Sequence, residues 1–359
     1  MLFPEINNVM KTKQAFNKRK EFLMIPSQKT NQVFLFILMN IFLWFPCTTF
    51  ANVSITQTIS LKSGWNAIFL EVLPDDPNPD TVFNGTPVIQ VLTFVPEISS
   101  IQFFKDPDEI QWKKDEWLRW VPPQYPEALL KNLYSLLNNQ AYLVFSTSDY
   151  TLNISGTPYL KKYKWQPNTY NLVGFHVDPV EPPTFFQYFE GSSAHNQLDI
   201  YTLTNNTWQH IDTPEQVNIE SGKAYWVYCK NSSQYVGPLD ISLPGVGDEL
   251  NFQDTIPQKD LTIVNRSKEL LSFTVTPIPN SITDAGVPLS IISYTDVTNK
   301  IFTPFESQSE VVAMEAGESV KFRLAIRRND MNAATVSSLL KVADDLGNRF
   351  YIPVIAEQY

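Results

Sequence analysis

The chain has 359 residues, an apolar fraction of 43% and a formal net charge of −10, so it is long enough for two or three domains with real cores and is too apolar for disorder. The first 51 residues hold six Lys or Arg and two Asp or Glu, which leaves the rest near −14, and a surface this acidic repels nucleic acid and anionic lipid. Twenty-four Phe, fifteen Tyr and twenty-six Pro with only twelve Gly predict an all-β chain.

Residues 1–51 are predicted to be a secretory signal peptide with an unusually long leading segment. Thirteen apolar residues, 33–45, stand before the small-residue site Thr49-Phe50-Ala51, and this run is too short to span a bilayer. We expect cleavage near Ala51 and a protein that is extracellular, on the cell surface or in the periplasm. No later run reaches the roughly 20 apolar residues of a membrane helix, so we expect no transmembrane helix in the mature chain.

A first β module is predicted over residues 52–158. Residues 53–61 alternate between polar and apolar side chains, Gly64 follows in a turn, and residues 65–72 form an apolar run. This order predicts a β-hairpin. Further short strands are expected at residues 88–95, 117–121, 141–146 and 150–155. About six such strands suit a small barrel or sandwich.

A second β module, residues 159–240, repeats the landmarks of the first. The stretch GWNAIFLEVLP at residue 64 returns 105 residues later as TYNLVGFHVDP, and QAYLVFS at residue 140 returns as KAYWVYC at residue 223. Matched landmarks at both ends of each copy predict a common order of strands. In the second copy strands are expected at residues 170–177, 199–203, 208–211, 224–228 and 233–236.

The first copy carries two insertions that the second copy lacks. About eighteen extra residues stand between Val95 and Glu116 and about eight between Pro123 and Gln140, where residues 127–137 have the spacing of a short helix. Insertions into repeated modules form loops on one face, which is often the face that binds a partner. The longer insertion contains the aromatic residues Phe103, Phe104 and Trp112.

After a predicted linker at residues 238–248, residues 249–359 are predicted to form an immunoglobulin-like β-sandwich. In VKFRLAI, residues 320–326, apolar side chains alternate with Lys321 and Arg323, as in a strand with one solvated face. Strands are expected at residues 261–265, 271–276, 289–294, 320–326, 339–343 and 349–355. About seven strands over this length is the immunoglobulin-like proportion.

These motifs carry a resemblance that covers residues 53–359. The pairing of GWN with AYWV resembles the tandem β modules of many secreted or surface proteins of environmental bacteria. The second copy departs from that pattern, with Thr169-Tyr170 where the first has Gly64-Trp65. The tail, with LTIVNRS, LLSFTV, AGESVKFRLAI and LLKVADDLGNRFYIPVIA, resembles sandwiches of the abnormal-spindle and major-sperm-protein type. The resemblance implies a non-catalytic extracellular protein and names no ligand.

Motifs for catalysis or for cofactor and metal binding are not found in the sequence. His176, His195 and His210 have no His or Cys at ligand spacing, and no nucleophile elbow, phosphate loop or dinucleotide fingerprint occurs. The loop DDPNPD at residues 75–80 has oxygens for calcium, but two prolines favour a solvated turn. Cys229 is predicted to be a buried thiol.

A binding role is expected instead. Exposed indole rings stack on sugars or anchor protein interfaces, so the candidate ligand-binding residues are Trp112, Phe103, Phe104 and Trp120. Trp117 has an equivalent in Trp208 and is expected in the core. We expect a non-enzymatic recognition or adhesion protein whose partner is an extracellular glycan or a surface protein. A structural spacer and an extracellular glycan-active hydrolase are the alternatives.

Overall fold

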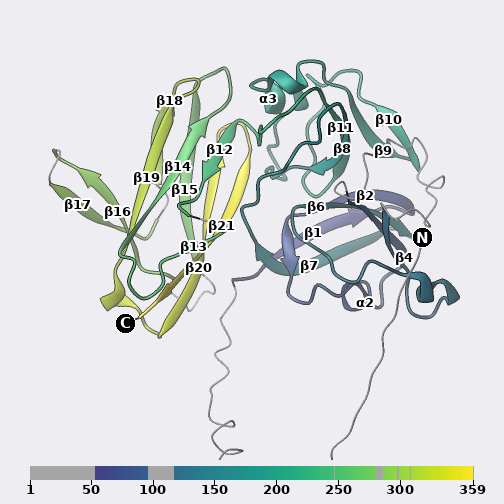
Figure 1. The fold of residues 1–359 in the computed structure, drawn as a ribbon, viewed down its shortest axis with the longest axis horizontal. Helices are drawn as coiled ribbons and strands as arrows, with labels where there is room; N and C mark the ends of the chain where they lie inside the picture. Colours follow the sequence, from purple (N-terminus) through teal and green to yellow (C-terminus); the bar gives the residue numbers. More distant parts are fainter. Residues whose placement is uncertain are drawn as a thin grey trace, which may run out of the picture. The chain divides into compact units, whose positions relative to one another are not determined.

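The computed structural model describes residues 53–95, 117–245, 247–279, 286–296, 299–307 and 309–358 (Figure 1). All of them belong to one unit, Phe50–Tyr359. Nearly all of the regular structure is β-strand, arranged in five sheets, so the predicted all-β class is confirmed. Among these residues no helix is both long enough and apolar enough to cross a membrane.

The first module is built from two sheets. A three-stranded sheet has the order β1 (Ile55–Leu61), β7 (Tyr150–Pro158) and β3 (Val72–Pro74). A four-stranded sheet has the order β2 (Gly64–Leu70), β6 (Gln140–Ser146), β4 (Val88–Phe94) and β5 (Trp117–Trp120). Apolar side chains from both sheets, among them Ile59, Ile68 and Tyr142, form one buried cluster, so the module is a small sandwich.

The expected hairpin between residues 53 and 72 is wrong. β1 pairs with β7 and β2 pairs with β6, so the two strands lie in different sheets. The turn between them is fixed by the Asn66 side chain, whose Oδ1 accepts the Lys62 N–H at 2.8 Å and whose Nδ2 donates to the Gly64 carbonyl at 2.9 Å. The turn therefore leads the chain from one sheet to the other.

The second copy repeats the four-stranded sheet, in the order β8 (Thr169–Gly174), β11 (Ala224–Cys229), β9 (Ile200–Thr204) and β10 (Thr207–His210). The register is the same in both copies: Ile68 pairs with Tyr142 in the first, and Val173 pairs with Tyr225 in the second. This shared order and register repeat the four-stranded sheet, whereas the three-stranded sheet of the first copy has no counterpart among the described strands of the second. The strand expected at residues 233–236 is absent, because side chains hold this segment: Tyr188 Oη and Trp165 Nε1 donate to its carbonyls.

The landmark strands are apolar because both of their faces are buried. Along β2, Ile68 and Leu70 point into the core of the first copy, whereas Trp65 and Phe69 join a second cluster. That second cluster includes Trp226 of the second copy. The four-stranded sheets of the two copies meet at this cluster, so both faces of β2 are buried. The sequence of β2 is therefore a nearly continuous apolar run and does not alternate as a half-exposed strand does.

The tail is a sandwich of two five-stranded sheets around one core. One sheet has the order β12 (Leu239–Ser242), β14 (Gln258–Asn265), β19 (Ser319–Ile326), β16 (Leu289–Tyr294) and β17 (Lys300–Phe305). The other has the order β13 (Leu250–Asn251), β21 (Arg349–Glu357), β20 (Thr335–Asp344), β15 (Leu271–Pro279) and β18 (Ser309–Met314). Each of the six expected strands is found. The expected linker is wrong in part, because β12 pairs with β14 and Leu239 and Ile241 are buried in the core.

The helices are short: α2 (Pro79–Val82), α3 (Phe185–Phe189) and the 3-10 turns η2 (Pro126–Leu130), η3 (Ser193–His195) and η4 (Arg328–Asp330). The helix expected over residues 127–137 is therefore wrong beyond Leu130. Past that point the backbone bonds to other segments, since the Leu133 N–H donates to the Arg119 carbonyl and the Leu136 N–H to the Pro77 carbonyl. The side chains of Leu133 and Leu136 are buried in the core of the first copy.

Candidate functional site

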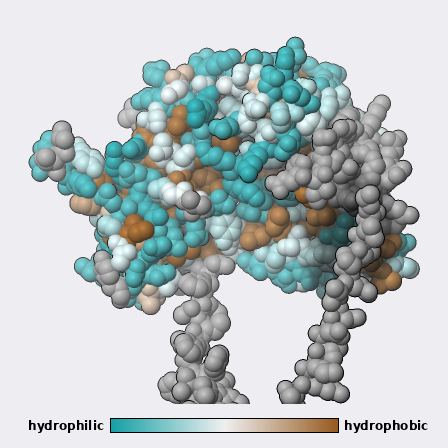
Figure 2. Space-filling model, viewed as in Figure 1, coloured by the Kyte–Doolittle hydropathy of each residue, from teal (hydrophilic) through white to brown (hydrophobic). Residues whose placement is uncertain are grey.

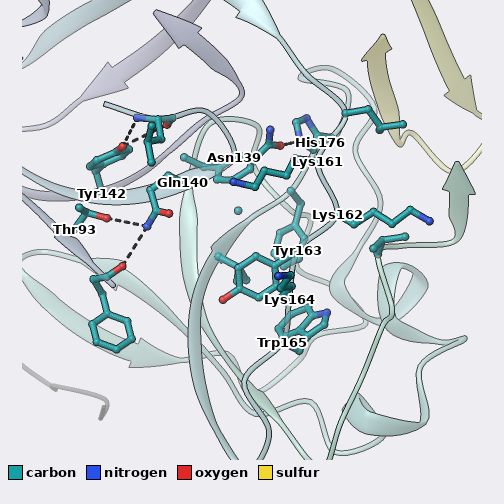
Figure 3. A pocket seen from close by; sticks show the side chains of 18 of the residues that line it. Thr93, Asn139, Gln140, Tyr142, Lys161, Lys162, Tyr163, Lys164, Trp165 and His176 are labelled. Carbon is teal, nitrogen blue, oxygen red and sulfur yellow. Dashed lines mark hydrogen bonds between the residues drawn. The ribbon is translucent and has the colours of Figure 1, made fainter. Parts of the chain in front are cut away.

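A cavity of about 430 Å³ is walled by residues of the first copy, the second copy and the tail sandwich (Figure 3). Phe94 and Leu118 come from β4 and β5 of the first copy, Phe175 follows β8 of the second, and Phe350 lies on β21 of the sandwich. The volume is in the range of small-molecule pockets, which are mostly apolar with a few polar groups. The cavity is therefore the candidate binding site.

Aromatic rings of the second copy form one wall. The rings of Phe175 and Tyr188 lie 4.7 Å apart. Tyr188 Oη donates to the Val236 carbonyl at 2.9 Å, and Tyr235 Oη donates to the Tyr188 carbonyl at 2.5 Å. Because each hydroxyl is hydrogen-bonded to backbone, the rings are fixed in place and present an apolar surface.

A second wall is the segment 160–166, LKKYKWQ, which joins the first copy to the second. The Lys162 amine binds Asp240 Oδ1 at 2.5 Å and Ser242 Oγ at 2.9 Å on β12 of the sandwich. Trp165 Nε1 donates to the Tyr235 carbonyl at 2.6 Å in the second copy. Although it has no regular secondary structure, the segment is anchored at both ends.

Three lysines of this segment, Lys161, Lys162 and Lys164, line the cavity. In Figure 3 the Lys161 side chain extends across the view toward Gln140, whereas Lys162 extends the other way, toward its partner on the sandwich. Lys161 also borders a second hollow of about 500 Å³ that Asp248, Glu249 and other polar residues line. The two hollows therefore differ in their lining. Lysines and aromatic rings line the first, whereas lysines and carboxylates line the second.

The remaining polar groups of the cavity include neutral amides, several hydroxyls and one imidazole. Gln140 Nε2 donates to Thr93 Oγ1 at 2.8 Å, and Thr93 Oγ1 donates in turn to the Ala141 carbonyl at 2.9 Å (Figure 3). Asn139 Oδ1 lies 2.5 Å from His176 Nε2. Asn139 has a positive φ of 53° and donates through Nδ2 to the Tyr159 carbonyl at 3.0 Å.

Next to the cavity a buried ion cluster ties the three parts together. Glu71 of the first copy accepts hydrogen bonds from Ser221 at 3.0 Å and from Arg349 of the sandwich at 3.4 Å, and His176 Nδ1 lies 3.7 Å away. Burial raises the pKa of the Glu71 carboxyl, but His176, Arg349 and Ser221 together outweigh burial and hold the pKa below its usual value. The carboxylate is therefore charged and fully engaged at neutral pH.

Of the sequence-predicted binding residues, Trp120 alone is among the described residues, and it does not line this cavity. Phe103, Phe104 and Trp112 lie outside the described residues, so their role in binding stays a prediction. Trp120 was expected to be available to a ligand, but only 2% of it is exposed. It packs against Phe83 and its Nε1 donates to Asp80 Oδ1 at 2.6 Å, so it belongs to the core of the first copy. Trp117 is fully buried, as expected.

The described part of the chain contains one buried Ser–His pair. Ser192 Oγ lies 2.6 Å from His195 Nδ1, and burial lowers the pKa of His195 to about 4. Both side chains are buried, and the His195 ring is stacked against Trp165 and Phe189, so a substrate does not reach this pair. Among the described residues no three His, Cys, Asp or Glu side chains are placed to hold a metal ion.

Two other expectations concern single residues. Cys229 is buried, as predicted, and burial raises the pKa of its thiol to about 11. In the loop considered for calcium, Asp80 binds Trp120 Nε1 and the Lys131 amine, and Asn78 Oδ1 accepts the Asp80 N–H at the start of α2. The oxygens of this loop therefore serve the first copy itself.

The segment after Pro123 exposes several large apolar side chains. Exposure rises from 39% at Tyr125 to 91% at Leu129, and Leu130, Tyr134 and Leu137 are also more than half exposed. Figure 2 shows a mainly hydrophilic face on which hydrophobic residues form small separate patches. Leu137 also lines the cavity, so this apolar segment adjoins the candidate site and is the main competing surface.

Comparison with known proteins adds little. No protein-family model matches the chain, and no curated protein matches its sequence. The chain is similar to the ASH/PapD-like domain 7 of human CEP192, at TM-score 0.21 and 6% identity over 34% of this chain and 85% of that one. It is also similar to a FixG-related protein from Vibrio parahaemolyticus, at TM-score 0.21 and 12% identity over 34% and 96%. A DUF4785 family protein from Legionella pneumophila matches at TM-score 0.18 and 9% identity over 84% and 89%. Scores this low carry no argument about function.

Sequence reasoning missed the cavity and the lysine segment. The segment lies where the first copy gives way to the second, and it has neither strand alternation nor helical spacing. Its composition was the available signal, since three lysines and two aromatic residues fall within residues 161–165 of an acidic chain.

Proposed function

We propose that this chain is a non-catalytic, exported recognition protein that binds its ligand in the cavity among its three parts. One observation carries the proposal: residues from all three parts converge on a mainly apolar cavity of about 430 Å³ with a few fixed polar groups. Cavities of this kind are the default binding sites of proteins. A structural spacer, the leading alternative, has no use for such a cavity.

A ligand screen tests this proposal. The exported protein is heated with a collection of small molecules, and compounds that bind the folded state raise its melting temperature. Ser135 is an exposed residue of the cavity wall, so Ser135→Trp is expected to abolish the stabilisation. Ser148 is exposed and lies outside the lining, so Ser148→Trp is the matched control. Stabilisation that survives Ser135→Trp, or a protein that no compound stabilises, contradicts the proposal.

Export is part of the same proposal. It is supported by the apolar run at residues 33–45 and by the small-residue site that ends at Ala51. Protein collected from outside the cytoplasm of its native host is expected to begin at Asn52. Sequencing that finds residues 1–31 still attached to the exported form contradicts this part.

A further inference from the structure

Of the charged lysine and carboxylate side chains, those that line the cavity have one sign. Lys161, Lys162 and Lys164 line it, whereas no described Asp or Glu does. This contrasts with the protein as a whole, whose net charge is −10. An acidic protein that gathers amines around one cavity has a local potential at that cavity opposite in sign to that of its surface as a whole.

Two of these amines are available to a ligand. The Lys162 amine is compensated by Asp240 Oδ1 at 2.5 Å. Neither Lys161 nor Lys164 forms an ion pair with a carboxylate in the part of the chain that the structure describes. A lysine amine offers three hydrogen-bond donors and no acceptor, so an anionic group of a ligand is the complement of this pair.

The rest of the lining is suited to an apolar body. Phe94, Phe175, Tyr235 and Phe350 surround the cavity, and the Tyr235 hydroxyl is already bonded to the Tyr188 carbonyl. Rings of this kind gain apolar contact with a ligand but supply few hydrogen bonds to a polyol. A neutral sugar with many hydroxyls therefore fits the site less well than a ligand with an apolar chain or ring.

Resting on the proposed function, we infer that the ligand is a small organic anion with an apolar body, of the aryl-alkyl or alkyl carboxylate class. Its carboxylate faces Lys161 and Lys164, and its body lies against the aromatic wall that contains Phe175. The same charges disfavour a cationic ligand by like-charge repulsion, which gives the site selectivity as well as affinity.

Three probes with one body and different charges test this inference. Isothermal titration of the exported protein with phenylbutyrate, phenylbutanol and phenylbutylamine compares an anion, a neutral molecule and a cation, and cellobiose represents a neutral glycan. A charge-assisted hydrogen bond to each amine is expected to make phenylbutyrate bind at least about tenfold more tightly than the other probes. Equal binding of the three matched probes, or tighter binding of cellobiose, overturns the inference.

Charge reversal provides the decisive variant. Lys161→Glu with Lys164→Glu is expected to reverse the preference, so that phenylbutylamine binds more tightly than phenylbutyrate. The control is Lys268→Glu with Lys321→Glu, which makes the same change in net charge at exposed positions outside the lining and is expected to keep the preference for the anion. If the reversed variant fails to fold, Lys161→Gln with Lys164→Gln is expected to lose the preference without reversing it. An unchanged preference in either cavity variant overturns the inference.

The outcomes separate this inference from the proposed function. If the three matched probes bind equally, the cavity still binds ligands and only the charge assignment fails. If no probe binds but other compounds stabilise the parent and not Ser135→Trp, the ligand class is wrong and the binding function stands. If no compound binds, both fail.

Discussion

At the scale of single residues, each copy is stabilised by a tyrosine that stands at the same position of the repeat. Tyr142 Oη accepts the Leu137 N–H at 2.7 Å, and Tyr225 Oη accepts the Glu220 N–H at 3.0 Å. In both cases the donor precedes the tyrosine by five residues, and both rings are buried. The hydroxyl therefore fixes the loop that enters each landmark strand.

Tyr142→Phe is expected to lower the free energy of unfolding by about 1–3 kcal/mol, because it leaves the Leu137 N–H without its acceptor. Tyr225→Phe is expected to cost a similar amount at Glu220. Urea unfolding measures both, and Tyr150→Phe is the control because that ring is 38% exposed. A loss at Tyr142 no larger than at Tyr150 contradicts the role of the hydroxyl.

The residue scale also shows why site prediction from sequence was limited. Trp120 and Phe69 are both buried aromatic residues in short strands, yet only Phe69 also lines the cavity. What separates them is which other segment lies opposite, and that segment is far away in the sequence. Phe350, for example, lies on a strand of the tail and completes the cavity of the two copies.

At the scale of elements, the turn before β2 joins the two copies. Gly64 has a φ of +98°, and a Cβ atom there would lie 2.1 Å from Asn206 Oδ1 of the second copy. The same oxygen accepts the Trp65 N–H at 2.6 Å. Glycine is needed at this position both for its backbone conformation and for the close approach of Asn206.

Gly64→Ala is expected to cost about 2–4 kcal/mol, because backbone strain adds to the displaced Asn206 hydrogen bond. Gly85→Ala is the matched control: its φ is +71°, no atom lies within 4 Å of the added Cβ, and only strain of about 1–2 kcal/mol is expected. Asn206→Gly is expected to cost less in the Gly64→Ala protein than in the parent. Additive costs in this double-mutant cycle, measured by urea unfolding, contradict the contact.

Elements differ in how far the sequence predicts them. Six of the tail strands were predicted, and in VKFRLAI and LSFTVT apolar side chains alternate with polar ones. Strand β2 was also predicted, but the sheet to which it belongs was not. An apolar run that is buried on both faces does not tell which sheet lies on which side, so the turn at Gly64 was mistaken for a hairpin rather than a crossing between sheets.

At the scale of the whole molecule, the Glu71 cluster connects the first copy, the second copy and the sandwich. The folded pKa of Glu71 lies below its usual value of 4.5. The cluster therefore contributes stability above about pH 4.5, and this contribution is lost as the pH falls through the folded pKa. Acid is expected to weaken the joint among the three parts.

Glu71→Gln is expected to lower the free energy of unfolding at neutral pH by about 3–5 kcal/mol, because Arg349 loses a buried partner. It is also expected to flatten the stability profile below about pH 4.5 relative to the parent. Asp149→Asn, which removes the surface pair with Lys62, serves as the control and is expected to change stability little. A Glu71→Gln profile parallel to that of the parent at every pH contradicts the assigned role of the carboxylate.

The central claim is that the cavity among the three parts is where this protein binds its ligand. Photolabelling with an aryl-alkyl carboxylate that carries a diazirine, followed by peptide mass spectrometry, tests it most directly. Labels are expected within residues 160–166 and at cavity residues such as Phe175 and Phe350, and excess phenylbutyrate is expected to suppress them. Labels concentrated instead on the exposed apolar segment at residues 125–137, with none at residues 160–166, would contradict the claim.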